Sequence, residues 1–119
     1  CWIAGFSFGS WIGMQLMMRR PEIQGFIAAT PPALTHDFSF LAPCPASGLI
    51  VHGEEDEQVP PDAVYKLVER LSIQKGVKID IDLVSGANHF FTDHLDSMIE
   101  TVSTYLDTAF TKPNFDPLA

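Results

Sequence analysis

Strand-like and helix-like segments alternate along this chain, and the alternation limits its possible folds more than any other feature does. Each strand-like segment is a short apolar run, and each helix-like segment repeats apolar residues with a period near 3.6. The strand-like runs are residues 1–5, 25–29, 48–52 and 79–83, and the helix-like segments are residues 10–19, 60–71 and 93–110. Strands that alternate with helices pair in parallel, so we predict an α/β fold with a parallel sheet flanked by helices.

Three local patterns refine this prediction. Residues 10–19 are apolar on nearly every side, so we expect a helix that is buried all round. Apolar and charged residues alternate over 78–83, which indicates an edge strand. Residues 30–47 contain four prolines and little periodicity, which indicates a long ordered loop.

The length of 119 residues suits one domain. We expect this domain to span residues 1–110 and a loose, proline-containing tail to follow at 111–119. Fifteen acidic and seven scattered basic residues give a net charge of −8. That charge argues against nucleic acid as a partner.

The cysteines and histidines predict neither a disulfide framework nor a metal site. Cys1 and Cys44 form no CxxC pair, which favours two reduced thiols in a cytoplasmic protein. The sequence has no pair of histidines at i, i+4 spacing, and neither cysteine has a partner at ligand spacing. We therefore expect no metal, no cofactor and chemistry that persists in EDTA. Charged residues interrupt every apolar run before it reaches the roughly 20 residues of a membrane span, so we expect no membrane partner either.

Ser7 is the candidate nucleophile. It lies at the centre of Gly5-Phe6-Ser7-Phe8-Gly9, between a predicted strand and a predicted helix. In that context the G-x-S-x-G pattern is a sharp turn in which small residues on both sides of the serine let neighbouring backbone approach closely. The amide after the nucleophile, here that of Phe8, donates to the oxyanion. The alternative is an idle serine in a glycine-rich turn.

His89 is the candidate general base. A serine hydroxyl needs a base whose neutral form exists near pH 7, and histidine meets that condition. His89 directly follows the last predicted strand, where loops gather at the carboxyl ends of a parallel sheet. His52 lies inside an apolar strand and is expected in the core. His36 and His94 could edge the pocket, although a surface position is favoured for both.

Asp56 is the candidate orienting acid. Glu54, Glu55 and Asp56 all follow the strand at 48–52. We prefer Asp56, because the turn ahead of Val59 and Pro60 would direct its short side chain back across the strand ends, leaving both glutamates in water. The chain order Ser, Asp, His is that of α/β-hydrolases.

Three segments together resemble the small bacterial esterases that are related to dienelactone hydrolase: Gly5–Trp11, His52–Pro60 and Gly86–Phe91. The resemblance extends to about Phe110 and implies an α/β-hydrolase fold, of which this chain is the C-terminal portion. It also implies a serine hydrolase that cleaves a carboxylic ester or thioester through an acyl-enzyme, with a triad of Ser7, Asp56 and His89.

The chain departs from the family pattern in two ways. Dienelactone hydrolases proper use cysteine as the nucleophile, so Ser7 favours ordinary esterase chemistry. Family members also have an N-terminal half of strands and helices, which is missing here and which supplies a second oxyanion N–H from the loop after an early strand. We therefore expect an exposed apolar edge at the strand near Trp2. An alternative follows: a non-catalytic or assembly-dependent fragment whose edge pairs with a second copy or with a separate N-terminal half.

The identity of the small-molecule ester cannot be read from the sequence. Five aromatic residues are candidates to line an apolar substrate pocket, with core packing as the alternative role. They are Phe6, Phe38, Phe40, Phe90 and Phe91.

Overall fold

The computed structural model describes residues 2–41, 46–72 and 77–111. Its elements are β1 (Trp2–Phe6), α1 (Phe8–Arg19), β2 (Gly25–Ala29), η1 (Ser39–Leu41), β3 (Ser47–Gly53), α2 (Pro61–Leu71), β4 (Ile79–Val84) and α3 (Leu95–Thr111). Cys1, Cys44 and the predicted tail from residue 112 onward lie outside the described residues.

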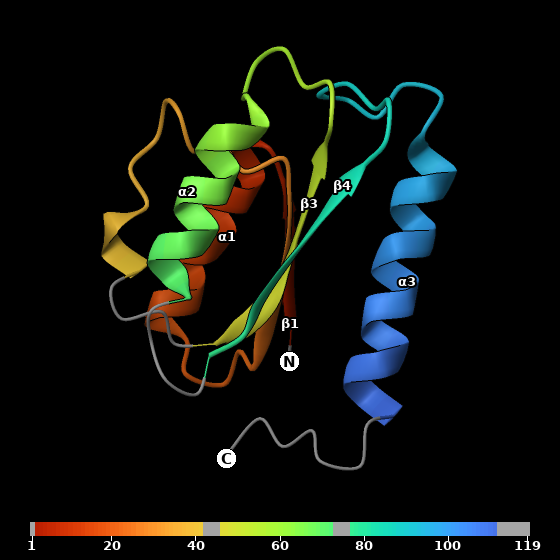
Figure 1. Ribbon diagram of the computed structural model, residues 1–119. Helices are drawn as coiled ribbons and strands as arrows, with labels where there is room; N and C mark the ends of the chain where they lie inside the picture. The colour runs from red at the N-terminus through yellow and green to blue at the C-terminus, as the bar shows by residue number, and fades with distance from the viewer. Residues whose placement is uncertain (1, 42–45, 73–76, 112–119) are drawn as a thin grey trace.

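All the strand pairs are parallel, and the described strands form a four-stranded sheet in the order β1-β2-β3-β4. Helices α1 and α2 cover one face of the sheet, and α3 covers the other (Figure 1). The predicted α/β class, with a parallel sheet flanked by helices, is therefore confirmed. Strand β4 lies at an edge, as its alternating pattern predicted.

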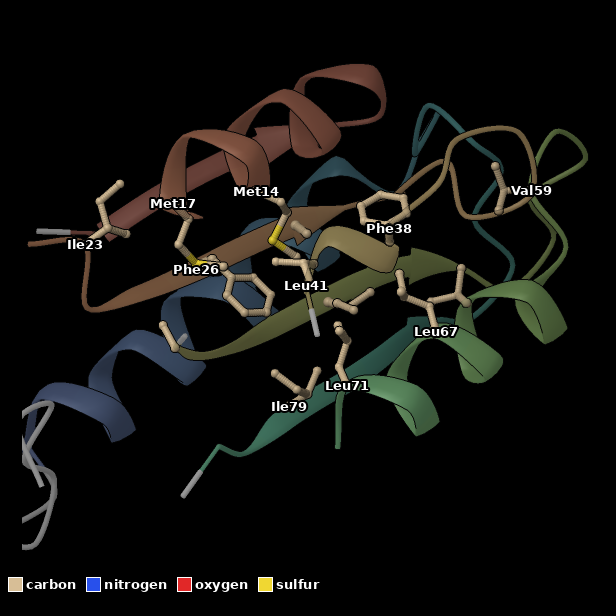
Figure 2. Packing of buried hydrophobic residues seen from close by; sticks show 14 residues of the cluster. Met14, Met17, Ile23, Phe26, Phe38, Leu41, Val59, Leu67, Leu71 and Ile79 are labelled. Carbon is tan, nitrogen blue, oxygen red and sulfur yellow. The ribbon is translucent and has the colours of Figure 1, made fainter. Parts of the chain in front are cut away.

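Two hydrophobic clusters lie on opposite faces of the sheet because successive strand residues point to opposite sides. On β3, Ile50 belongs to the cluster under α1 and α2, whereas Val51 belongs to the cluster under α3. The first cluster is the larger one, and its members Met14, Phe26 and Leu67 lie between the helices and the sheet (Figure 2). Together the two clusters hold the helices against the sheet. The candidate site lies at the carboxyl ends of the strands of this sheet.

Helix α1 is buried on one face only, so the prediction that it is buried all round is wrong. Met14 and Met17 are 1% and 2% exposed, whereas Ile12, Leu16 and Met18 are 45%, 44% and 40% exposed. A helix that rests on one sheet presents a single stripe to it. Within the described residues, Trp11 packs partly against the larger cluster, whereas Ile12, Leu16 and Met18 stay exposed.

Two further boundaries differ from the predictions. The loop predicted for residues 30–47 contains η1, and Phe38 and Leu41 from this region are buried in the larger cluster. Helix α3 begins at Leu95 rather than near Asp93, because Asp93 has a φ of 62°, outside the helical range. Among helices of the described ranges, none combines the length and apolarity needed to cross a membrane.

Candidate active site

Ser7 lies at the carboxyl end of β1 in a strained turn. Its φ of 53° and ψ of −122° are uncommon for a residue with a side chain. The backbone N–H of Ser7 donates to the Ala29 carbonyl at 2.7 Å, and the Ser10 hydroxyl donates to the Ser7 carbonyl at 2.6 Å. These bonds hold the backbone of Ser7 in this conformation.

The two glycines of the turn have different roles. A Cβ on Gly5 would lie 2.5 Å from the Gly9 carbonyl oxygen, so only glycine fits there without backbone movement. A Cβ on Gly9 would meet nothing within 4 Å. The expectation of close backbone approach on both sides of the serine is therefore wrong for Gly9, because α1 directs that position outward.

His89 lies in the loop after β4 and is 5% exposed. Its Nε2 is 3.0 Å from Ser7 Oγ, and its Nδ1 is 2.8 Å from Asp56 Oδ2. An ionised carboxylate only accepts hydrogen bonds, so Nδ1 carries the proton and Nε2 accepts from the serine hydroxyl. The loop is held by the Asn88 side chain, which accepts from the amides of Phe90 and Thr92 at 3.1 and 3.0 Å.

Asp56 lies in the turn after β3, and its side chain is fully buried. Its Oδ1 accepts from the amides of Gln58 and Val59, both at 2.8 Å, and its Oδ2 faces His89. These donors stabilise a buried negative charge. Glu54 and Glu55 are exposed, as predicted for solvated turn residues.

The structure thus brings Ser7, His89 and Asp56 into one hydrogen-bonded line, although 82 and 33 residues separate the paired side chains. They meet because parallel strands present their carboxyl ends at the same edge of the sheet. Such a line can withdraw the serine proton while the carboxylate holds the imidazole in the required tautomer.

The aromatic candidates divide into two groups. Phe6 and Phe90 are 40% and 62% exposed, and their ring centroids lie 6.0 and 4.9 Å from that of His89. Phe38 and Phe91 are 3% and 1% exposed, and Phe40 packs against the larger cluster. Phe38 and Phe91 thus belong to the hydrophobic clusters and Phe40 is partly buried against one of them, which favours the alternative role of core packing for these three.

A hollow of about 230 Å³ lies beside the imidazole. It is lined by Glu57, Gln58, Asn88, His89 and Phe90. Phe8, next to the serine, is the first residue of α1, so its amide has no intrahelical acceptor and is open to a developing oxyanion.

The remaining histidines have distinct surroundings. His52 is 0% exposed, which confirms its predicted core position, and burial lowers its pKa despite a hydrogen bond to the Val59 carbonyl and the nearby Asp56 charge. His36 is half-buried, with ring centroids 5.4 Å from Phe8 and 5.0 Å from Trp11. No sequence pattern indicates this contact with the serine turn, because it depends on how the loop folds back.

A family model with the description "Dienelactone hydrolase family" matches residues 1–112. The chain belongs to the dienelactone hydrolase family. The matched residues include the G-x-S-x-G turn and the two loops that carry Asp56 and His89.

Two relatives match most of this chain. An uncharacterized protein of Rickettsia prowazekii, RP471, is 50% identical over 110 residues, which is 89% of this chain and 46% of that protein. The crystal structure of ATU1826, a protein of unknown function from Agrobacterium tumefaciens, is 51% identical with a TM-score of 0.93, covering 95% of this chain and 52% of that one.

A third relative extends the likeness at lower identity. The structure of an α-β serine hydrolase homologue from Coxiella burnetii is 31% identical with a TM-score of 0.78, covering 88% of this chain and 48% of that one. This chain therefore spans about half the length of the relatives that it matches. Its described residues contain no group of three or more His, Cys, Asp or Glu side chains that could hold a metal ion.

Proposed function

We propose that this chain carries the catalytic triad of a serine hydrolase that cleaves a carboxylic ester or thioester, with Ser7 as nucleophile, His89 as general base and Asp56 as orienting acid. One observation carries the proposal: Ser7 Oγ, both nitrogens of His89 and Asp56 Oδ2 form a continuous line with contacts of 3.0 and 2.8 Å. Membership in a hydrolase family supports the same reaction class.

The first half of the proposed reaction forms an acyl-enzyme. Ser7 Oγ attacks the carbonyl carbon while its proton moves to His89 Nε2. The amide of Phe8 donates to the oxygen that becomes negative. When the carbonyl reforms, the bond to the leaving alcohol or thiol breaks, and that group takes the proton from Nε2.

The second half releases the acid. A water molecule attacks the acyl carbon and passes a proton to His89 Nε2, and that proton returns to Ser7 Oγ as the ester bond to the enzyme breaks. Asp56 remains ionised throughout and stabilises the imidazolium that forms twice per turnover.

Phe6 and Phe90 suggest an apolar group beside the scissile bond. Their exposed rings flank the imidazole, and exposed aromatic surface at the mouth of a reactive group favours burial of an apolar acyl or alcohol moiety. We therefore expect short aliphatic or aromatic esters to react faster than esters with charged groups next to the carbonyl.

Labelling with a fluorophosphonate tests the nucleophile directly, because the reagent reacts with an activated serine without needing a known substrate. The wild-type chain should be labelled and Ser7→Ala should not. Ser85→Ala removes an exposed serine from the loop that carries His89 and is the matched control; it should be labelled like the wild type. Equal labelling of wild type and Ser7→Ala would remove Ser7 from the proposed role.

A second candidate is activity that depends on assembly. Ile12, Leu16 and Met18 are exposed apolar side chains of α1, and β1 lies at an edge of the sheet. The proposed occupant is a polypeptide with the early strands of the α/β-hydrolase fold, because this chain spans only about half the length of its relatives. Those strands provide the second oxyanion N–H, whose loss typically lowers turnover by about 10²–10³.

Light scattering and co-expression separate the two candidates. Under the assembly proposal, the chain alone associates at micromolar concentration through the open edge. Co-expression with the N-terminal half of a relative should then give a one-to-one complex with faster labelling. A monodisperse monomer whose labelling rate is unaffected by that half would contradict assembly dependence.

A further inference from the structure

His52 lies beside the candidate triad without belonging to it. It comes from β3, its side chain is fully buried, and its Nε2 lies 2.7 Å from the Val59 carbonyl oxygen and 3.5 Å from Asp56 Oδ2. A carbonyl oxygen only accepts hydrogen bonds, so Nε2 carries a proton. The N–H therefore points to the Val59 carbonyl, and the carboxylate that His89 contacts lies close to the same nitrogen.

The backbone of Val59 also connects His52 to Asp56 through hydrogen bonds. The Val59 amide donates to Asp56 Oδ1 at 2.8 Å, while its carbonyl accepts from His52 Nε2. These bonds fix the peptide groups on both sides of the Val59 α-carbon. Movement of the Val59 carbonyl would therefore turn the neighbouring amide away from Asp56.

Burial keeps this imidazole neutral, since removal from water lowers the pKa of His52. A neutral imidazole supplies a directed N–H beside Asp56 without adding a positive charge that would compete with His89 for the carboxylate. Among the atoms that the structure describes, His52 Nδ1 has no hydrogen-bond partner. The contacts of this side chain are thus made through the nitrogen that faces the turn of the acid.

We propose that His52 is a positioning residue for the triad: its Nε2–H holds the Val59 peptide groups and, through them, aims the Asp56 carboxylate at His89. This proposal rests on the proposed function. It assigns His52 no contact with the substrate, and its effect passes through Asp56.

Glutamine and asparagine at position 52 separate positioning from simple loss of a buried group. The side-chain amide nitrogen of His52→Gln reaches near the place of imidazole Nε2, whereas that of His52→Asn is one carbon shorter and does not. Ile50→Val is the control for weakened packing, because Ile50 lies two residues earlier on the same strand face and is also 0% exposed. His52→Leu removes the donor altogether.

Two measurements report on the triad of the folded chain. Proton NMR detects the exchange-protected Nδ1–H of His89, assigned by its loss in His89→Gln, and its chemical shift follows the hydrogen bond to Asp56. The second measurement is the rate constant of fluorophosphonate labelling. Misplacement of a reacting group by about 1 Å can cost about 10²-fold in rate, so we expect a loss of about 10- to 100-fold in His52→Asn and His52→Leu.

The expected result is a wild-type-like His89 resonance and labelling rate in Ile50→Val and His52→Gln, with an upfield or absent resonance and slow labelling in His52→Asn. If His52→Leu does not fold, the comparison between His52→Gln and His52→Asn still tests the positioning role. Identical resonances and rates in His52→Gln and His52→Asn would overturn the proposal. Failure of the wild type to label would contradict the proposed function instead, and the resonance would still test the positioning role.

Discussion

Gly53 lies so close to Ala87 that a Cβ on Gly53 would be 2.5 Å from the Ala87 carbonyl oxygen. This contact joins the turn that carries Asp56 to the loop that carries His89. The Glu55 amide also donates to the Ala87 carbonyl at 2.8 Å. The distance between acid and base is therefore set by backbone packing as well as by their own hydrogen bond.

Gly53→Ala should push the two loops apart. Overpacking of this kind costs about 1–3 kcal/mol of unfolding free energy, and the Asp56–His89 contact should lengthen. We expect slower fluorophosphonate labelling together with a lower urea midpoint. A variant that labels at the wild-type rate would show that the loops adjust without moving the triad.

The two glycines of the serine turn should respond in opposite ways. Gly5→Ala places its Cβ against the backbone of Gly9, so it should destabilise the fold and slow labelling. Gly9→Ala has open space and lies within α1, where alanine is favoured over glycine by about 0.5–1 kcal/mol. Thermal unfolding of both variants checks this, and equal losses of stability would contradict it.

Asp56→Asn should abolish reactivity while the fold survives. The amide oxygen can still accept from Gln58 and Val59, but the amide nitrogen then faces His89 Nδ1 and favours the wrong tautomer. The same change in a serine protease triad lowers turnover by about 10⁴-fold. Labelling kinetics measure the loss, and circular dichroism checks the fold. A loss of less than tenfold would argue against Asp56 as the orienting acid.

Stability should fall on the acid side through His52. Burial lowers the pKa of His52 in the folded chain below its ordinary value of 6.5, so between those two values the unfolded chain binds more protons. Its contribution is complete above about pH 6.5 and decreases as the pH falls below that value. Urea unfolding at pH 7.5 and 5 should show a larger loss for wild type than for His52→Gln, and parallel losses would contradict the assignment.

Stability should also fall on the alkaline side through Tyr105. Burial, with a smaller effect from Asp80, raises the pKa of Tyr105 to about 12 from its ordinary value of 10.0. The unfolded chain loses this proton first, so the stabilisation is complete below pH 10 and declines as the pH rises toward 12. Tyr105→Phe should lose less stability than wild type between pH 9 and 11 in thermal unfolding.

The pattern of residues alone determined the element order, the parallel sheet and the loops in which Ser7, Asp56 and His89 lie. Hydrophobic periodicity reports which local structure a segment forms, and chain order limits how such segments pair. The choice of Asp56 over Glu54 and Glu55 was also based on local sequence, namely on the position of Asp56 in the turn that follows the strand.

Only the tertiary structure decided which side chains face the site and which face the core. Phe90 and Phe91 are adjacent in sequence, yet one is 62% exposed and the other 1%, because Phe91 packs in the hydrophobic cluster under α3. His52 and Val59 likewise reach Asp56 through contacts that no sequence pattern records. Periodicity carries no information about where a loop returns, and exposure depends on what packs against a residue from distant parts of the chain.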